Sequence, residues 1–334
     1  MLVWNTTGHA TVIERFESAI TNHNVSHAYI FYGSRQVGKM TCALDIARGL
    51  NCIDPSDLAC GKCIQCLRIQ KKIHADVHII SIQNSENKRS IGISDVRDIL
   101  HVSHMKPYEG SYRITIIDDA DLMTLEASNA LLKTLEEPAE QNVFFLLTAN
   151  EEALIPTIKS RCQSIYFSIL DSESVSQHLS QNYDLSDEKI GLLTTLCAGR
   201  LGWAVDALSD DGLLEERDDA IRLFVDVLKG GLYRGFEVSE HLSNEYYKNS
   251  EYVLNTLHYW TDMYRDLLIM KKADIDLIHN IDKEEQLSAL IDECNEEELA
   301  DNIGLVLDST SQLLDNVVPR LCLDNLIMRI NHKI

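Results

Sequence analysis

The sequence GSRQVGKMT, which begins at Gly33, has the spacing of a phosphate-binding loop. In the motif G-x-x-x-x-G-K-[ST], backbone N–H groups and the lysine bind phosphates, and the hydroxyl after the lysine ligates Mg²⁺. Gly33, Gly38 and Lys39 keep the phosphate-binding part, but Met40 stands where the hydroxyl is required. The hydroxyl of Thr41 comes one residue later, turned by about 100° around the following helix. The sequence therefore predicts a loop that binds nucleotide weakly and has lost its metal ligand.

An acidic pair, Asp118 and Asp119, follows the apolar segment ITII. Asp118 is placed to act as the carboxylate on the metal side of a nucleotide site. Active hydrolases usually carry Glu at the next position, and the side chain of Asp119 is one methylene shorter, which leaves a general base too far from its proton. The alternative, an acidic strand end that caps the next helix, stays open. Asn150, at the end of LLTAN, is a weaker candidate for the γ-phosphate, because turns favour Asn.

Arg161 lies in Ser160-Arg161-Cys162, between a helix-like stretch and the last apolar segment of the first half. A guanidinium stays charged and carries five donors in a planar fork, so it can stabilise phosphoryl charge in a neighbouring subunit's site as an arginine finger. The alternative is a surface arginine in a turn, which is the more common role of a lone arginine.

Four cysteines have the spacing C-x7-C-x2-C-x2-C: Cys52, Cys60, Cys63 and Cys66. Four thiolates can surround a tetrahedral Zn²⁺ and leave no open position, which makes a structural site. An iron–sulfur cluster is the chemical competitor, because C-x2-C-x2-C also binds such clusters. We expect the other five cysteines to be packing residues: Cys42, Cys162, Cys197, Cys294 and Cys322.

The composition sets limits on location and partners. No apolar run approaches the ~20 residues that span a bilayer, and the N-terminus lacks a secretory signal, so we expect a cytoplasmic protein without a membrane partner. The formal net charge is −22, which argues against a large nucleic-acid footprint. A zinc-dependent DNA-binding module remains an unfavoured alternative, with a basic patch made of Lys62, Arg68, Lys71 and Lys72.

The first half alternates apolar runs with helical patterns, which is typical of a parallel sheet covered on both faces. The expected strands are 27–32, 77–82, 114–117, 143–148 and 164–169, and a helix over 39–50 follows the glycine loop. Ser94 and Thr124 are predicted to cap two further helices. After about residue 170 the pattern predicts only helices: three short ones over 171–208, then long amphipathic ones, including 252–270 and 305–330.

Taken together, the glycine loop, ITIIDDAD, NALLKTLEEP, LLTAN and IKSRC resemble the AAA+ clamp-loader subunits of bacterial DNA replication. The resemblance extends over roughly the first half of the chain. It implies an α/β AAA+ P-loop domain with a parallel sheet over 1–168, including a zinc-binding module at about 52–66. It also implies a helical lid over 169–210 and an all-α collar over 211–334 that joins subunits.

Within this family, three departures make the chain more similar to the non-catalytic delta-prime class than to the ATP-hydrolysing gamma/tau class. They are Met40, Asp119, and Gly202 at the place where active subunits carry a lid arginine, although Arg200 lies two residues earlier. The resemblance implies structural Zn²⁺, weak or absent ATP/Mg²⁺ at the chain's own site, and Arg161 serving the ATP of an adjoining gamma subunit. The implied partners are gamma/tau, delta, the sliding clamp and primer-template DNA. An active gamma-like ATPase is the alternative.

Overall fold

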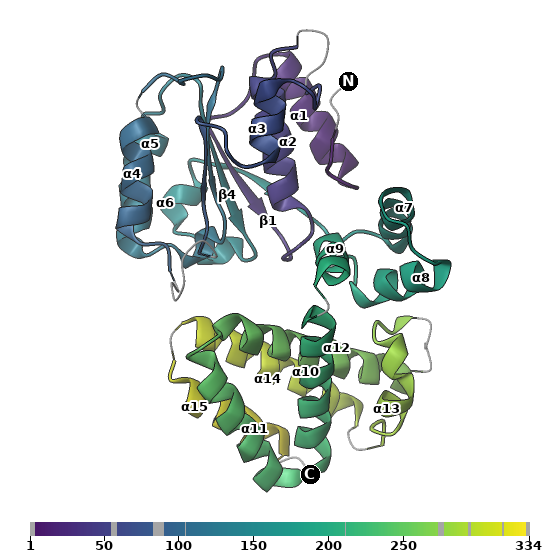
Figure 1. The fold of residues 1–334 in the computed structure, drawn as a ribbon. Helices are drawn as coiled ribbons and strands as arrows, with labels where there is room; N and C mark the ends of the chain where they lie inside the picture. Colours follow the sequence, from purple (N-terminus) through teal and green to yellow (C-terminus); the bar gives the residue numbers. More distant parts are fainter. Residues whose placement is uncertain are drawn as a thin grey trace. The chain divides into compact units, whose positions relative to one another are not determined.

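The computed structural model describes residues 4–54, 59–82, 90–103, 105–210, 212–272, 277–292, 295–315 and 317–331. These residues pack into two compact units (Figure 1). The first unit is Met1–Asn182 with Gly199–Gly202, and the second is Tyr183–Ala198 with Trp203–Ile334. The domain boundaries expected at residues 168 and 210 stay predictions.

The first unit is built on a five-stranded parallel sheet, which confirms the predicted α/β class. The strand order is β2-β3-β4-β1-β5. The strands are β1 (Ala28–Tyr32), β2 (Val77–Ile80), β3 (Arg113–Ile117), β4 (Asn142–Thr148) and β5 (Gln163–Tyr166). The segments after β1, β3 and β4 contain the glycine loop, the acidic pair and Asn150. Because the carboxyl ends of parallel strands meet at one edge, the sheet places these three segments at the same edge.

Helices cover both faces of this sheet (Figure 1). One face packs against α1 (Ala10–Thr21) and α2 (Lys39–Asn51), and α3 (Ile64–Gln70) joins the same core. The opposite core includes α4 (Ile93–Ser103), α5 (Leu125–Glu136) and α6 (Pro156–Lys159). Strand side chains alternate between the two cores, because successive residues of a strand point to opposite faces. Phe31 and Phe145 lie in the first core, whereas Ile30 and Phe144 lie in the second.

The two predicted helix caps have different outcomes. Thr124 caps α5, and its side-chain oxygen accepts a hydrogen bond from the Ala127 N–H at 3.2 Å, as predicted. The prediction for Ser94 is wrong, because α4 already begins at Ile93. The Asp95 carboxylate accepts a hydrogen bond from the Gly92 N–H at 2.9 Å and so takes the capping role at this end.

After β5 the described residues contain only helices, as predicted. The three short ones are α7 (Ser172–Asn182), α8 (Asp187–Leu196) and α9 (Leu201–Ser209). The longer helices are α10 (Gly212–Lys229), α11 (Gly231–Tyr246), α12 (Ser250–Lys271), α14 (Glu296–Leu314) and α15 (Pro319–Asn331), with a short α13 (Glu284–Ser288). Single 3₁₀ turns lie at Ala120–Leu122, Glu151–Ala153 and Ile281–Lys283.

The prediction of one helix over 305–330 is wrong. The helix α14 ends at Leu314, and α15 begins at Pro319. Proline lacks the N–H that a continuing helix needs, and its fixed φ suits the first turn of a new helix.

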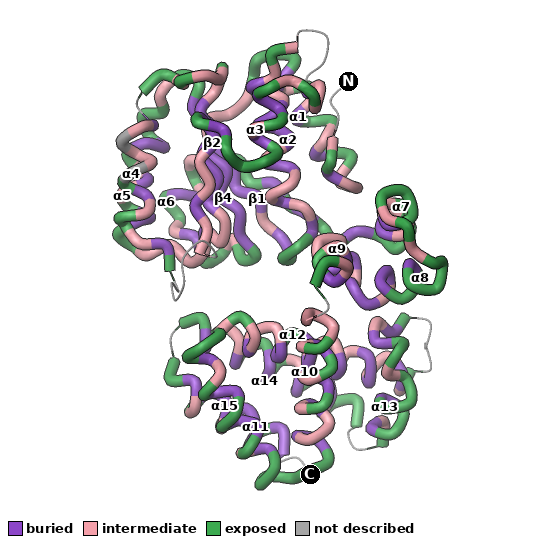
Figure 2. The backbone as a smooth tube through the Cα atoms, in the orientation of Figure 1, coloured by how far each residue is buried: buried purple, intermediate pink, exposed green. Residues whose placement is uncertain are grey.

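The second unit has its own apolar core, visible as the buried inner faces of its helices in Figure 2. Trp260 and Tyr264 are fully buried there, and the indole of Trp260 donates a hydrogen bond to the Ala220 carbonyl at 2.9 Å. The buried aromatic residues of this unit therefore pack between helices, whereas Tyr247 is 59% exposed. No described helix is long and apolar enough to cross a bilayer.

Candidate functional site

The glycine loop connects β1 to α2, which is the strand-loop-helix context that the motif requires. Gly33 has φ 136°, and a Cβ at this position would lie 2.1 Å from the Phe167 carbonyl oxygen. Only glycine allows the loop to leave β1 so close to the backbone that follows β5. Gly38 has φ 103° and is the N-cap of α2, so the backbone N–H groups of the first turn of α2 face the loop.

Lys39 folds back over its own loop. The side chain is 8% exposed, and Nζ donates hydrogen bonds to the Gly33 carbonyl at 2.5 Å and to the Ser34 carbonyl at 2.6 Å. Burial lowers the pKa of Lys39 to about 8, although the nearby Asp118 acts in the opposite direction. A phosphate that entered this loop would have to replace two carbonyl contacts of the lysine.

The side chain of Met40 is half-buried and packs against the core between the sheet and α2. The position at which a metal-ligating hydroxyl is expected therefore contributes to apolar packing. Thr41, also half-buried, occupies the next position of α2.

The acidic pair lies beside this loop. Asp119 adopts a left-handed conformation (φ 52°), and its carboxylate forms an ion pair with Arg35 of the glycine loop at 3.1 Å. The Asp119 N–H donates to the Asp118 carboxylate at 3.2 Å. The pKa of Asp118 is raised, mainly by burial and to a smaller extent by the negative charge of Asp119, while the positive charge of Lys39 acts in the opposite direction. The structure thus brings Lys39, Asp118 and Asp119 together, and it adds Arg35, which the sequence analysis missed.

Asn150 is the N-cap of a 3₁₀ turn. Its side-chain oxygen accepts a hydrogen bond from the Glu152 N–H at 3.0 Å and caps the 3₁₀ turn that follows β4. The hydroxyl of Thr148, at the end of β4, donates a hydrogen bond to the Asp121 carboxylate at 2.7 Å and accepts one from the Asn150 N–H at 2.9 Å. Asp121 was also missed by the sequence analysis. A contact of Asn150 with a γ-phosphate stays a prediction.

Gly202 lies directly against the glycine loop. Its N–H donates to the Gln36 carbonyl at 2.8 Å, and a Cβ added to Gly202 would lie 2.9 Å from that oxygen. A longer side chain at this position would have to displace Gln36. Arg200, two residues earlier, is 8% exposed.

Arg161 lies in the turn between α6 and β5, and its side chain is 33% exposed. Nη2 forms an ion pair with the Glu136 carboxylate at 2.7 Å, while Nη1 donates to the Thr157 carbonyl at 2.8 Å and to the Ser160 hydroxyl at 3.2 Å. The guanidinium is therefore available at the surface and is held by its own turn and by the end of α5.

The four clustered cysteines meet in the fold. One Sγ from each of Cys52, Cys60, Cys63 and Cys66 lies within 4.8 Å of the others, and the Cys52 and Cys63 sulfurs are 4.0 Å apart. Tetrahedral zinc with Zn–S bonds of about 2.3 Å needs sulfurs about 3.8 Å apart, so the four side chains fit Zn²⁺ with a small contraction.

Backbone N–H groups around the cluster point at the sulfurs. Cys60 accepts from the Cys63 N–H at 3.2 Å, Cys52 accepts from the Cys60 N–H at 3.4 Å, and Cys63 accepts from the Cys66 N–H at 3.4 Å. Such bonds stabilise thiolates, the form that ligates metal. At Cys63 these bonds, together with hydrogen bonds from neighbouring thiols, outweigh burial and lower the pKa to about 7, whereas burial raises the pKa of Cys52 and Cys66.

Three of the remaining cysteines, Cys42, Cys197 and Cys322, are buried, and Cys162 is half-buried, as expected for packing residues. Cys294 lies outside the described residues.

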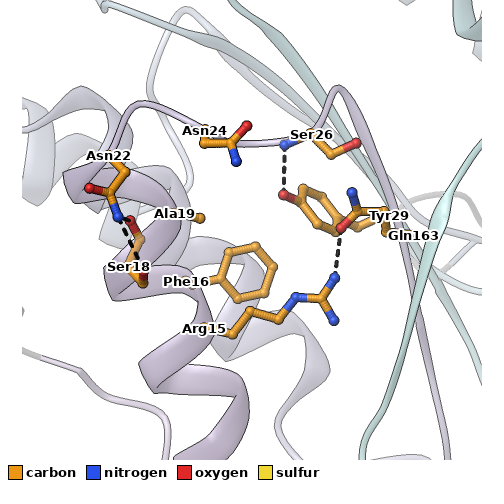
Figure 3. A pocket seen from close by; sticks show the side chains of 9 residues that line it. All are labelled: Arg15, Phe16, Ser18, Ala19, Asn22, Asn24, Ser26, Tyr29 and Gln163. Atoms are coloured by element: carbon orange, nitrogen blue, oxygen red, sulfur yellow. Dashed lines mark hydrogen bonds between the residues drawn. The ribbon is translucent and has the colours of Figure 1, made fainter.

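An open polar hollow of about 450 Å³ lies between α1 and the start of β1 (Figure 3). Arg15 donates to the Gln163 side chain at 2.6 Å across its mouth, and the Ser26 N–H donates to the Tyr29 hydroxyl at 2.7 Å. None of the predicted site residues lines this hollow.

Comparison with known proteins gives consistent matches. The sequence profile of the family described as "DNA polymerase III, delta subunit" matches residues 8–171. The delta' subunit of DNA polymerase III from Bacillus subtilis is 25% identical over 317 residues, which cover 95% of this chain and 94% of that protein.

Tau-type subunits match the first part of the chain at higher identity. The tau subunit of Bacillus subtilis is 33% identical over 225 residues, covering 66% of this chain and 38% of tau. The tau/gamma subunit of Haemophilus influenzae is 34% identical over 174 residues, which cover 52% of this chain and 25% of that protein. The chain thus spans well under half of these tau-type relatives, but nearly all of the delta' relative.

Among solved structures, a gamma-subunit-related protein from Thermotoga maritima aligns over 95% of this chain and 98% of its own, with 19% identity and a TM-score of 0.47. A likeness of this size adds nothing to the sequence matches.

Proposed function

We propose that the chain is a delta-prime-type subunit of the DNA polymerase III clamp loader, one that hydrolyses no ATP itself and supplies Arg161 to the ATP site of a neighbouring subunit. The match to a delta' subunit over 94% of that protein's length supports the class. The observation that carries the proposal is Met40, a half-buried apolar side chain that packs against the core at the position of the metal-ligating hydroxyl.

The chain's own nucleotide site is weakened at three points. Met40 cannot ligate Mg²⁺, Asp119 is short for a general base and is paired with Arg35, and Gly202 offers no guanidinium to a bound phosphate. Without the metal, the charge that develops on a transferring phosphoryl group is poorly compensated. ATP/Mg²⁺ at this site is therefore weak or absent, and hydrolysis is negligible.

Arg161 meets the requirements of a finger that acts on another subunit. It lies at the surface, its guanidinium is always charged, and its position is fixed by a short turn between α6 and β5. Placed beside the triphosphate of an adjoining gamma/tau subunit, it would compensate the negative charge of the transition state. A contribution of this kind is worth about 10³ to 10⁵ in rate.

The partners follow from this role. We propose assembly with gamma/tau and delta subunits through the helical second unit, and action on the sliding clamp and primer-template DNA through the complex. Such a complex would work in the cytoplasm. The cysteine cluster would hold a structural Zn²⁺ with no open coordination position.

The proposal is tested by Arg161→Ala in the complex reconstituted with gamma/tau, delta, the clamp and primed DNA. We expect hydrolysis at the ATP site adjoining this chain to fall by about 10³-fold or more, and clamp loading to slow with it. Arg222→Ala is the control, because Arg222 is also an exposed arginine in an ion pair, with Asp219 at 2.6 Å. Unchanged ATP hydrolysis and clamp loading in Arg161→Ala would contradict the proposal.

An active gamma-like ATPase is the second candidate, and the 33% identity to a tau subunit over 225 residues favours it. This candidate requires the loop to tolerate Met40 through backbone and Lys39 contacts alone. The two candidates differ in whether the isolated chain turns ATP over.

A further inference from the structure

The guanidinium of Arg161 is already occupied by contacts within its own chain. Both terminal nitrogens are used: Nη2 by the Glu136 carboxylate at 2.7 Å, and Nη1 by the carbonyl and hydroxyl groups of the α6 turn. A finger that reaches a triphosphate needs these same donors. Arg161 therefore has to leave Glu136 before it can make a bidentate contact elsewhere.

Glu136 is brought close to Arg161 by apolar packing between α5 and α6, and this packing does not involve either charged group. Glu136 is the last residue of α5, and Arg161 follows α6. The two helices are joined by a shared apolar cluster in which Ile158 of α6 lies with Leu131 and Leu135 of α5. The carbonyl end of a helix carries partial negative charge, and Glu136 adds a full one, so a cation is favoured at this end.

We propose that Glu136 is a positioning residue that holds Arg161 in a docked state, from which the finger is released when a neighbour's triphosphate competes for it. This inference rests on the proposed role of Arg161. The carboxylate opposes engagement in two ways: it occupies Nη2, and its charge would repel the triphosphate that Arg161 approaches.

The docked state is weak enough to be reversible. The side chains of Arg161 and Glu136 are 33% and 51% exposed, and ion pairs of this exposure are modest in water and screened by salt. We expect the removal of the carboxylate to speed finger engagement by up to about fivefold at low ionic strength. The gain should shrink as added salt weakens the ion pair of the unmodified chain.

The test is a double-mutant cycle in the reconstituted complex, with single-turnover ATP hydrolysis at the adjoining site as the readout. The four chains are the unmodified one, Glu136→Gln, Arg161→Ala, and the double variant. Glu152→Gln is the matched control, because Glu152 forms a similar exposed ion pair with Lys159 of α6 at 2.9 Å. Glu136→Asp is a second variant that keeps the charge but shortens its reach.

We expect Glu136→Gln to raise the rate by about two- to fivefold, Glu136→Asp to fall between it and the unmodified chain, and Glu152→Gln to change nothing. In the Arg161→Ala background, Glu136→Gln should have no effect. If Glu136→Gln leaves the rate unchanged or lowers it, or if it acts equally with and without Arg161, this inference is wrong but the proposed function of Arg161 still stands. If Arg161→Ala itself has no effect, both this inference and the proposed function fail.

Discussion

At the scale of single residues, the account depends on side chains that differ from an active nucleotide site by a few atoms. Met40 replaces a hydroxyl with a thioether and packs into the core, and Asp119 is shorter than Glu and is neutralised by Arg35 at 3.1 Å. Each change alone weakens one step of hydrolysis. In the proposed function, the two changes together would deprive the site of a metal ligand and a general base, although the loop keeps its glycines and Lys39.

Restoring the hydroxyl tests this reasoning. We expect Met40→Thr to tighten ATP binding in the presence of Mg²⁺ by about tenfold, the effect of one added polar contact to a charged ligand worth about 1.4 kcal/mol. Turnover should stay absent, because Asp119 is unchanged. Nucleotide titrations of the isolated chain with Mg²⁺ and with a chelator measure the difference. If Met40→Thr bound ATP equally well with Mg²⁺ and with the chelator, Met40 would not be the reason that the site binds Mg²⁺ poorly.

The site residues that could be predicted from the sequence are those that belong to a short motif with a characteristic spacing. The glycine loop, the acidic pair and the cysteine spacing are such patterns, and the structure brings the members of each together. The residues it missed, Arg35, Asp121 and Glu136, act through partners at least 25 positions away in the sequence. Short-range spacing carries no signal for such pairs.

At the scale of elements, the loop that precedes β3 is anchored by one buried carboxylate, that of Asp76. It accepts hydrogen bonds from three consecutive N–H groups, those of Tyr108, Glu109 and Gly110, at 2.7 to 2.9 Å. It also pairs with the Arg113 guanidinium at 3.0 Å. Burial favours the neutral acid, but these four contacts outweigh it and lower the pKa of Asp76 to about 2.

The depressed pKa gives a stability prediction with a definite sign. The ordinary pKa is 3.8, so the contribution of Asp76, roughly 2 kcal/mol, is present above about pH 4 and is lost as the pH falls towards 2. We expect Asp76→Asn to lower the free energy of unfolding by about that amount at pH 7. Denaturant titrations at several pH values should show the difference between the two chains shrinking below pH 4. A difference that is constant with pH would rule out the carboxylate as its source.

The cysteine cluster is a second anchoring element. Beside it, Gln65 of α3 donates to the Glu109 carbonyl at 2.8 Å, and Arg68 pairs with the Glu109 carboxylate. The metal site would therefore fix α3, and through α3 the same loop that Asp76 holds. Zinc removal should loosen both.

Elemental analysis of the purified chain is expected to give one zinc per molecule. Cys60→Ser should lose the metal and lower the melting temperature, because four ligands are needed for a closed structural site. Cys162→Ser, a half-buried cysteine outside the cluster, should retain the metal. Iron in place of zinc, or full zinc retention in Cys60→Ser, would contradict the assignment.

Strands β1, β3 and β4 were predictable because each is an apolar run that is buried along almost its whole length. Strand β5 is exposed at three of its four residues, and it ends at Tyr166, three residues before the predicted end. The errors fell at the ends of strands and helices, and β2 likewise ends at Ile80 rather than at residue 82. The start of α4 depends on one hydrogen bond, from the Gly92 N–H to the Asp95 carboxylate, and the break between α14 and α15 depends on the ring of Pro319. The periodicity of apolar residues does not detect either feature.

At the scale of the whole molecule, the net charge of −22 is compatible with the proposed role, in which the chain binds other proteins and reaches DNA only through the complex. The DNA-binding alternative loses one of its four basic residues, because Arg68 is paired with Glu109. The three remaining lysines, Lys62, Lys71 and Lys72, lie at opposite ends of α3 on a strongly acidic protein.

In the proposed role, this chain supplies a catalytic charge to a neighbouring subunit and hydrolyses no ATP of its own. Steady-state ATP hydrolysis by the purified chain alone, with Mg²⁺ and saturating ATP, tests this most directly. We predict a rate that does not exceed that of a buffer blank, because the metal ligand and the general base are both absent from its own site. Sustained turnover proportional to the amount of chain would contradict the account.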